Sequence, residues 1–258
     1  MYKLISSDFD GTLVDNEESI PLSTVLTIDV LRRQNIKFAI ATGRIRKSIL
    51  DYNKDFHFVD YIISCNGSNV YDVKRKKDIF SAKLTKKILK EIEKKYRDQI
   101  IYFCTDQEWI KYENKKIEDK LFSEWINSNE DIRKIEIHFP DKSHAKKAMK
   151  EIEEMDLAIK HNIAHYPGQY LVELVPKSIN KYTGMKELTK HLKIKEDSVV
   201  AIGDSYNDLE LLKNIKHSVA VENAIDDVKK VVKHITSSND NKGVEKIIHK
   251  LIPIDKTL

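Results

Sequence analysis

Cysteine is scarce in this chain. Only Cys65 and Cys104 occur among its 258 residues. Neither has metal-ligand spacing, so a disulfide scaffold and a thiolate metal site are excluded. We expect both to be small buried residues of a reduced cytoplasmic protein. Long apolar runs are also missing, so no segment is predicted to span a membrane.

A strong charge bias is absent as well. The chain has 45 Lys and Arg against 41 Asp and Glu, a formal net charge of +4. The basic run Lys74–Lys77 lacks the interleaved aromatic residues on which bases would stack. We therefore predict a basic hairpin tip there and no nucleic-acid partner. Internal repeats, low-complexity tracts and long linkers are also missing from the sequence.

Apolar strands and amphipathic helices alternate over both ends of the chain. This alternation is typical of a doubly wound α/β fold with a parallel sheet and right-handed crossovers. A hydrophobic content of 41% supplies a sizeable core. Ser23 is expected to cap the first helix. The expected elements are strands at 2–7, 37–41, 61–65, 198–203 and 218–221, helices at 23–34 and 45–52, and a hairpin formed by 70–72 and 78–81.

A different mixture of elements fills the middle of the chain. It predicts an α+β insert with a mainly antiparallel sheet at residues 83–176, within a core formed by residues 1–82 and 177–258. An insert of this length is far longer than an ordinary loop. Its expected elements are helices at 86–96, 117–126 and 143–155, and strands at 100–104, 109–112, 135–139, 158–161 and 170–175.

An acidic pair, Asp8 and Asp10, directly follows the first predicted strand. Side chains two apart on an extended segment point the same way. The two carboxylates would thus converge at the carboxyl end of the strand, where open α/β sheets bind ligands. Such a pair needs a cation or a shifted pKa. The alternative interpretation is a strand followed by an Asp-rich turn.

Three later segments favour a site over a turn. Thr42-Gly43-Arg44 ends an apolar strand with a hydroxyl, backbone amides and a cation that suit an anion, although Thr-Gly is also an ordinary turn. Lys181 begins a helical stretch, but it is one of 45 basic residues. The most specific segment is Gly203–Asp208, where Asp204, Asn207 and Asp208 follow a buried strand, which is a pattern typical of metal ligation.

In this order, the segments resemble the four motifs of the haloacid dehalogenase superfamily of phosphohydrolases. Asp8–Leu13 matches the first motif, Thr42–Arg44 the second, Lys181 the third and Gly203–Asp208 the fourth. The resemblance covers essentially the whole chain and is closest to the Cof-type branch, subfamily IIB, whose cap domain lies between the second and third motifs. One departure is Tyr182, which stands where the family often has glycine.

The resemblance implies a role for each motif residue. Asp8 would be the nucleophile that forms an aspartyl-phosphate. Asp10 would be the acid and base and would also offer its backbone carbonyl to Mg²⁺, and Arg44 would brace its loop. The phosphoryl oxygens would be held by Thr42, Gly43, Lys181 and Asn207. The expected metal-site residues are Asp8, Asp10, Asp204 and Asp208, a hard-oxygen set that suits Mg²⁺.

The sequence therefore predicts a Mg²⁺-dependent phosphatase that acts on a small phosphorylated metabolite, such as a sugar phosphate or a phosphorylated cofactor. The alternatives are a phosphomutase of the same superfamily and a non-catalytic metabolite-binding regulator. A phospho-receiver domain would not need the insert. No membrane partner is expected, and the sequence leaves a monomer and a homodimer both open.

Substrate selection is expected to come from the cap, because the four motifs handle only the phosphate and the metal. The candidates are His161, His165, Tyr166 and Tyr170, around Pro167-Gly168. The alternative for these residues is packing within a hairpin.

Overall fold

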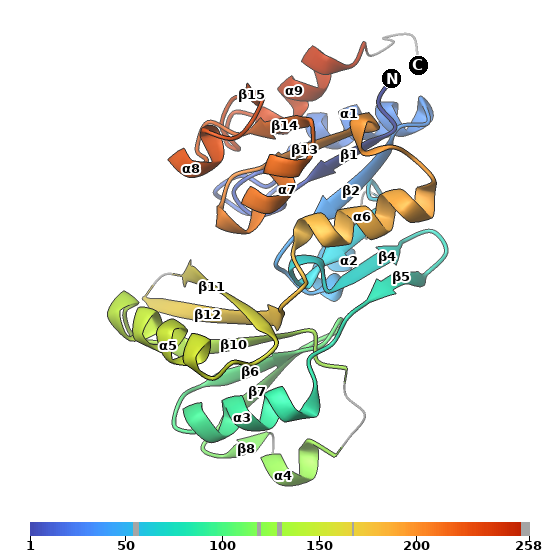
Figure 1. Cartoon of the computed structure of the whole chain (residues 1–258). Helices are drawn as coiled ribbons and strands as arrows, with labels where there is room; N and C mark the ends of the chain where they lie inside the picture. The colour runs from blue at the N-terminus through green and yellow to red at the C-terminus, as the bar shows by residue number, and fades with distance from the viewer. Residues whose placement is uncertain (54–56, 118–119, 128–130, 167, 254–258) are drawn as a thin grey trace. The chain divides into compact units, whose positions relative to one another are not determined.

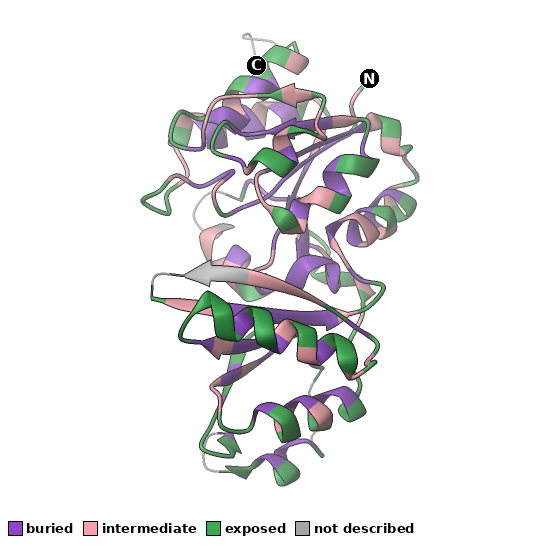
Figure 2. Ribbon diagram, turned by 60° about the vertical axis from the view of Figure 1, so that its left-hand side comes forward, coloured by how far each residue is buried: buried purple, intermediate pink, exposed green. Residues whose placement is uncertain are grey.

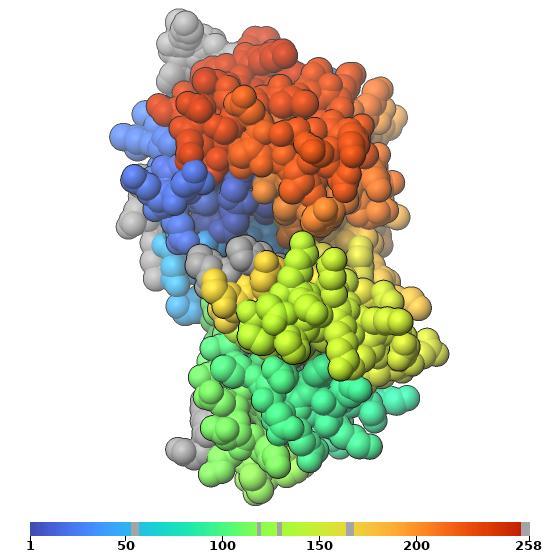
Figure 3. All heavy atoms as spheres, turned by 90° about the vertical axis from the view of Figure 1, so that its left-hand side faces the viewer, coloured from blue at the N-terminus to red at the C-terminus, as the bar shows by residue number. Residues whose placement is uncertain are grey.

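The computed structural model describes residues 1–53, 57–117, 120–127, 131–166 and 168–253. The chain divides into two compact units, Met1–Phe80 with Asn180–Leu258, and Ser81–Ile179. Figure 3 shows the first unit built from both ends of the sequence, blue and orange to red, and the second from its green and yellow middle. Each helix among the described residues is too short or too polar to span a bilayer.

The first unit contains an eight-stranded sheet (Figure 1). Its order is β15-β14-β13-β1-β2-β3-β4-β5, and the pairs from β15 to β3 are parallel, whereas β3 and β4 are antiparallel. The parallel strands are nearly continuous apolar runs because both sheet faces are covered. The strands are β1 Leu4–Ser7, β2 Lys37–Ala41, β3 Tyr61–Ser64, β4 Asn69–Asp72, β5 Lys77–Ser81, β13 Val199–Gly203, β14 His217–Ala220 and β15 His234–Ile235.

Helices complete the layers of this unit. α1 (Leu22–Arg33) packs against α9 (Gly243–Leu251), and α6 (Lys181–Leu192) packs against α7 (Leu209–Asn214). The remaining helices are α2 Arg46–Asn53 and α8 Asp226–Lys229. The expected doubly wound α/β class is confirmed.

The predicted cap of α1 is wrong. The N-cap position is Pro21, and α1 begins at Leu22, so Ser23 lies inside the helix. The Ser23 hydroxyl donates instead to Glu245 Oε2 of α9, at 2.7 Å. The Ser23 hydroxyl therefore forms a hydrogen bond between two helices and does not cap its own helix.

The second unit is an α+β structure around a seven-stranded sheet of order β11-β12-β10-β6-β7-β8-β9. All of its described strand pairs are antiparallel. Figure 2 shows buried residues along the sheet and on the inner sides of helices whose outer sides are exposed. The elements are β6 Ile101–Cys104, β7 Trp109–Glu113, β8 Lys116–Ile117, β9 Lys120–Leu121, β10 Lys134–Phe139, β11 Ile159–Tyr166, β12 Gln169–Pro176, α3 Lys86–Tyr96, α4 Phe122–Trp125 and α5 Lys142–Glu154.

The helix predicted over residues 117–126 is wrong in its first part and confirmed in its second, while residues 118 and 119 lie outside the described residues. Among the described residues of this range, α4, Phe122–Trp125, is helical, whereas Ile117 belongs to β8 and Lys120–Leu121 form β9. Asn114 and Lys115 both have positive φ, 52° and 64°, in the two-residue connection between β7 and β8. This tight turn sends the chain back as a hairpin, and Ile117 then pairs with Tyr112.

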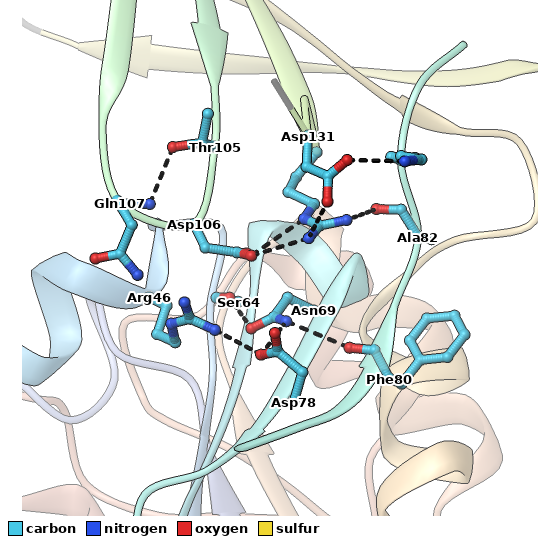
Figure 4. Close-up of polar contacts among 12 residues, drawn as sticks. Arg46, Ser64, Asn69, Asp78, Phe80, Ala82, Thr105, Asp106, Gln107 and Asp131 are labelled. Atoms are coloured by element: carbon cyan, nitrogen blue, oxygen red, sulfur yellow. Dashed lines mark hydrogen bonds and ion pairs between the residues drawn. The ribbon is translucent and has the colours of Figure 1, made fainter. Parts of the chain in front are cut away.

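Polar contacts hold the chain near the end of β5 within each unit (Figure 4). In the first unit, Asn69 Nδ2 donates to Asp78 Oδ1 at 2.9 Å and to the Phe80 carbonyl at 3.3 Å. In the second, Arg133 Nη1 donates to the Ala82 carbonyl at 3.2 Å, and its Nε and Nη2 donate to Asp106 Oδ2. The segments on both sides of the division are thus anchored locally.

Candidate active site

Two acidic residues follow adjacent strands at the carboxyl edge of the first unit's sheet. β1 pairs with β13 so that Ser7 lies opposite Ile202, and the Asp8 amide donates to the Ile202 carbonyl at 2.8 Å. Asp204 is the first residue after β13. The parallel register therefore brings Asp8 and Asp204 together, as expected for a site at this edge of an α/β sheet.

Asp8, Asp204 and Asp208 form an acidic group in which the potential ligand atoms lie within 4.8 Å of one another. Lys181 stands between two of them. Its Nζ is 2.7 Å from Asp8 Oδ1 and 2.7 Å from Asp208 Oδ1, and the side chain is fully buried. A buried ammonium needs such partners, because an unpaired buried charge is strongly destabilising.

The backbone around α6 places Lys181. Asn180 caps the helix by accepting from the Thr183 amide, so Lys181 is its first residue. Gly67 lies against this helix start with φ +102°, and a Cβ there would lie 2.1 Å from the Asn180 carbonyl oxygen. Only glycine fits such a close approach. Lys177, by contrast, is exposed.

The electrostatics of the group are those of crowded, buried carboxylates. Burial and the neighbouring Asp208 raise the pKa of Asp8 well above its ordinary value, against the lowering effect of Lys181. Burial and Asp208 also raise the pKa of Asp204, to about 6. Burial by itself would lower the pKa of Lys181, but the two carboxylates raise it. A divalent cation would relieve the repulsion among these carboxylates.

Asp208 is oriented by its own loop. Its Oδ2 accepts from the amides of Asp204 and Ser205, each at 3.1 Å, while Oδ1 accepts from Lys181. The carboxylate occupies the space beside Gly203, where a Cβ would lie 2.5 Å from its Cγ. Asp208 thus ties the Asp204 loop to Lys181.

The expected convergence of Asp8 and Asp10 is wrong for the Asp10 carboxylate. It is half-exposed and pairs with Arg44, whose Nε and Nη2 donate to its oxygens at 2.6–3.0 Å. The chain leaves β1 at Ser7, so the two-residue alternation of a strand no longer applies. The Arg44 guanidinium lies over the rings of Phe9 and Tyr52, and Arg44 therefore braces this loop.

Three of the expected phosphate-binding residues, Thr42, Gly43 and Asn207, lie around Asn66. Asn207 Nδ2 donates to Asn66 Oδ1 at 3.0 Å, and a Cβ at Gly43 would lie 3.2 Å from the same oxygen. The Asn66 amide donates to the carbonyl of the buried Thr42 at 3.0 Å. Cys65, Asn66 and Gly67 all have positive φ, and such strained backbone often accompanies functional sites.

Two contributors were not in the predicted set. Asn66 connects the loops after β2 and β13, and its signal in the sequence is the Asn-Gly pair directly after a strand. Thr12 is buried, and its hydroxyl donates to Asp204 Oδ1 at 2.7 Å. Thr12 lies within Asp8–Leu13, the segment that resembles the first motif, but that resemblance assigned no role to its side chain.

A family model described as haloacid dehalogenase-like hydrolase matches residues 5–248. The chain belongs to this family. A phosphoglycolate phosphatase of Saccharolobus solfataricus is 26% identical, with 98% of this chain and 96% of that protein covered. A 5-amino-6-(5-phospho-D-ribitylamino)uracil phosphatase of Bacillus subtilis is 26% identical over 95% and 94% of the two chains. The family and these relatives together support a phosphoric monoester hydrolase.

Solved structures share the fold. A haloacid dehalogenase-like hydrolase from B. subtilis superposes with a TM-score of 0.85 at 20% identity, covering 97% of this chain and all of that one. A structure described as a subclass IIB sugar phosphatase gives 0.78 at 23% identity, over 96% and 98%. The family match over residues 5–248 confirms the expected membership of this superfamily, and these structures confirm the fold.

The departure at Tyr182 leaves this haloacid dehalogenase-like site intact. Tyr182 lies in the first turn of α6, where any ordinary residue fits, and its hydroxyl donates to Glu196 Oε2 at 3.0 Å. Lys181 accordingly keeps its place between the two carboxylates.

The candidate selector residues of the second unit have mixed outcomes. His161 Nε2 lies 3.0 Å from Glu153 Oε1 of α5, and Tyr170 packs against the apolar core of its unit. Both contacts fit the alternative of packing within the hairpin. The side chains of His165 and Tyr166 lie outside the described part of the structure.

Proposed function

We propose that this chain is a Mg²⁺-dependent phosphatase of small phosphorylated metabolites that works through an aspartyl-phosphate. The observation that carries the proposal is a buried carboxylate, Asp8, that contacts a buried ammonium and shares an acidic group with Asp204 and Asp208. The oxygen-only donor set suits Mg²⁺. Asp8 and Asp204 would hold the ion, with Asp208 orienting its loop.

Asp8 supplies the nucleophile. Its carboxylate oxygen attacks phosphorus, a new O–P bond forms, and the bond from phosphorus to the leaving oxygen breaks. Lys181 favours the charged form of Asp8 and offsets the negative charge on the phosphoryl oxygens. Bound Mg²⁺ would supply additional electrostatic stabilisation of that charge.

Asp10 would manage the protons. Its carboxyl gives a proton to the leaving oxygen, and its carboxylate then takes one from the water that cleaves the acyl phosphate, which restores Asp8 and releases phosphate. In the structure this carboxylate is paired with Arg44, and it would turn from Arg44 to reach the leaving oxygen. Thr42, Gly43 and Asn207 would donate to the phosphoryl oxygens.

The substrate is proposed to be a small metabolite, since the relatives with named substrates act on phosphoglycolate and on a phosphoribitylamino-uracil. We propose that the inserted α+β unit, taken as residues 83–176, is a cap that selects the leaving group, while residues 1–82 and 177–258 bind metal and phosphate. This division of labour would separate discrimination from chemistry.

A turnover screen tests the proposal. Purified protein is incubated with a panel of phosphometabolites, with and without Mg²⁺, and released phosphate is measured. Asp8→Asn should fold normally and lose at least about a thousandfold in kcat, because the first covalent step is lost. Near wild-type turnover in that variant would exclude the mechanism, and an isomeric sugar phosphate formed without released phosphate would favour a phosphomutase.

A further inference from the structure

Asparagine amides connect three loops at the carboxyl edge of the first unit's sheet. Asn223, in the loop after β14, donates from Nδ2 to the Gly11 carbonyl at 2.7 Å. The backbone amide of Asn239, in the loop after β15, donates to Asn223 Oδ1 at 3.0 Å. Asn239 Nδ2 in turn donates to the Val14 carbonyl at 3.1 Å. The loop that follows Asp8 is thus held at Gly11 and Val14.

The opposite side of this loop faces the acidic group. Gly11 has φ +70°, and a Cβ there would lie 3.0 Å from Asp204 Oδ2. The next residue, Thr12, donates its hydroxyl to Asp204 Oδ1 at 2.7 Å. The Gly11–Thr12 backbone therefore lies between Asp204 on one side and Asn223 on the other.

The sheet order explains how Asn223 and Asn239 reach the loop that follows β1. β13, which ends directly before Asp204, lies between β1 and β14. The loop after β1 must pass the end of β13 to reach Asn223 and Asn239. A hydrogen bond to the Gly11 carbonyl fixes the orientation of that peptide and restricts the adjoining Asp10–Gly11 peptide, because rotations about Gly11 couple the two. Loss of the bond frees a glycine that has unusually wide backbone freedom.

Burial separates the roles of the two asparagines. Asn239 is 4% exposed and contributes to the packing of its loop, whereas Asn223 is exposed. Substitution of an exposed side chain usually changes stability little. An effect of Asn223 on the site can therefore be measured apart from an effect on folding.

We infer that Asn223 is a positioning residue that orients the Gly11–Thr12 segment against Asp204 and thereby sets the affinity of the site for a divalent cation. It acts through Gly11 and is not itself a catalytic group. The inference rests on the proposed function only in taking Asp204 as a metal ligand. Partners that orient metal ligands commonly affect metal affinity or activity by about 10–100-fold.

Two substitutions distinguish this role from a structural one. Asn223→Ala removes both hydrogen bonds of the side chain. Asn223→Asp keeps the oxygen that accepts from the Asn239 amide and removes the donor to Gly11. The matched control is Asn241→Ala, an exposed amide whose Nδ2 donates to Ser238 Oγ at 2.9 Å within its own loop. Positioning of Gly11 predicts that the first two variants behave alike.

The experiment measures Mg²⁺ binding to metal-free protein by isothermal titration calorimetry, with Tm, kcat and KM of each variant. Both Asn223 variants should raise the Kd for Mg²⁺ by about tenfold and lower kcat with little change in KM or Tm. Asn241→Ala should match wild type. Wild-type Mg²⁺ affinity in either Asn223 variant, or a Kd change accompanied by an equal change in the control, would overturn the inference.

The result also separates the inference from the proposed function. A wild-type protein that binds Mg²⁺ but hydrolyses no phosphate ester would overturn the function, while the calorimetric comparison would still decide the role of Asn223. A wild-type protein that binds no Mg²⁺ would overturn both.

Discussion

Lys181 is the residue on which the charge balance of the site depends, since its ammonium contacts Asp8 and Asp208. Lys181→Ala should lower kcat by at least about a hundredfold and destabilise the fold by about 3–5 kcal/mol, because the two carboxylates lose their buried counter-charge. Kinetics and denaturant unfolding measure the two effects. The exposed Lys177→Ala should change stability by less than about 0.5 kcal/mol; the reverse pattern would assign the role to Lys177.

Asp204 gives the metal-free protein a pH-dependent stability. Burial and the neighbouring Asp208 raise its folded pKa to about 6 from the ordinary value of 3.8, so the ionised group is unfavourable in the folded state. This penalty is present above pH 6 and fades as the pH falls through 6 towards 3.8. Thermal unfolding in chelator should therefore show Asp204→Asn to be more stable than wild type at pH 8 and nearly equal at pH 4. Saturating Mg²⁺ should reverse the order at pH 8, and an unchanged order would contradict a metal role for Asp204.

At the scale of single residues, the sequence predicted which types of side chain meet, but not every direction in which they point. Asp8, Asp204 and Asp208 come together because their positions follow from the ends of β1 and β13. Asp10 turns to Arg44 because its backbone has already left the strand, where the alternation rule fails. The contact of Thr12 with Asp204 spans most of the chain, so local pattern carries no sign of it.

At the scale of elements, Gly67 allows the turn after β3 to approach the start of α6 closely. Gly67→Ala should destabilise the protein and lower activity, because its Cβ would meet the Asn180 carbonyl at 2.1 Å and displace the start of α6. Gly168→Ala is the control, since its φ is also positive, +79°, and nothing lies within 4 Å of its Cβ. The control isolates backbone strain, worth about 1 kcal/mol.

The comparison uses Tm and kcat of the two glycine variants. Gly67→Ala should lose clearly more stability than Gly168→Ala and should alone reduce kcat. Equal losses in both variants would mean that strain, and not the approach of α6, governs this position.

Elements with strong periodicity were predicted well, whereas those set by turns were not. The parallel strands of the first unit are uninterrupted apolar runs, so their places were evident. Residues 117–126 were predicted as a helix, but Asn114 and Lys115, both left-handed, fold the chain back as a hairpin in which Ile117 pairs with Tyr112. An Asn-Lys pair does not require the left-handed conformation, so this turn could not be predicted from the two residue types alone.

The whole molecule should depend on a small hard cation. Chelation should abolish phosphatase activity and Mg²⁺ should restore it, whereas Ca²⁺ should restore little, because its larger and looser coordination shell misplaces the attacking carboxylate. Activity is measured after dialysis against chelator and again after each ion is added. Full activity in excess chelator would rule out metal dependence, and equal recovery with Ca²⁺ would rule out the geometric argument.

At this scale the order of motifs carried most of the information. The sequence divided the chain at 82/83 and 176/177, and the compact units divide at 80/81 and 179/180. Composition could not place these boundaries. The residues on either side of them belong to strands or short connections, and only tertiary contacts decide to which unit such residues belong. The role of the second unit as a cap stays a prediction.

The glycines beside the carboxylates have a consequence for mutational surveys. A Cβ at Gly203 would occupy the position of Asp208, and one at Gly11 would press on Asp204. A saturation library scored only by growth or colour would therefore rank these glycines with Asp8, although they carry no chemistry. Scoring the same library for soluble, protease-resistant protein would sort the two kinds apart: Asp8 variants would persist as inert protein, and Gly203 variants would be degraded. In any redesign of this enzyme, Gly203 and Gly11 should therefore be kept, because the absence of their side chains leaves room for Asp208 and Asp204.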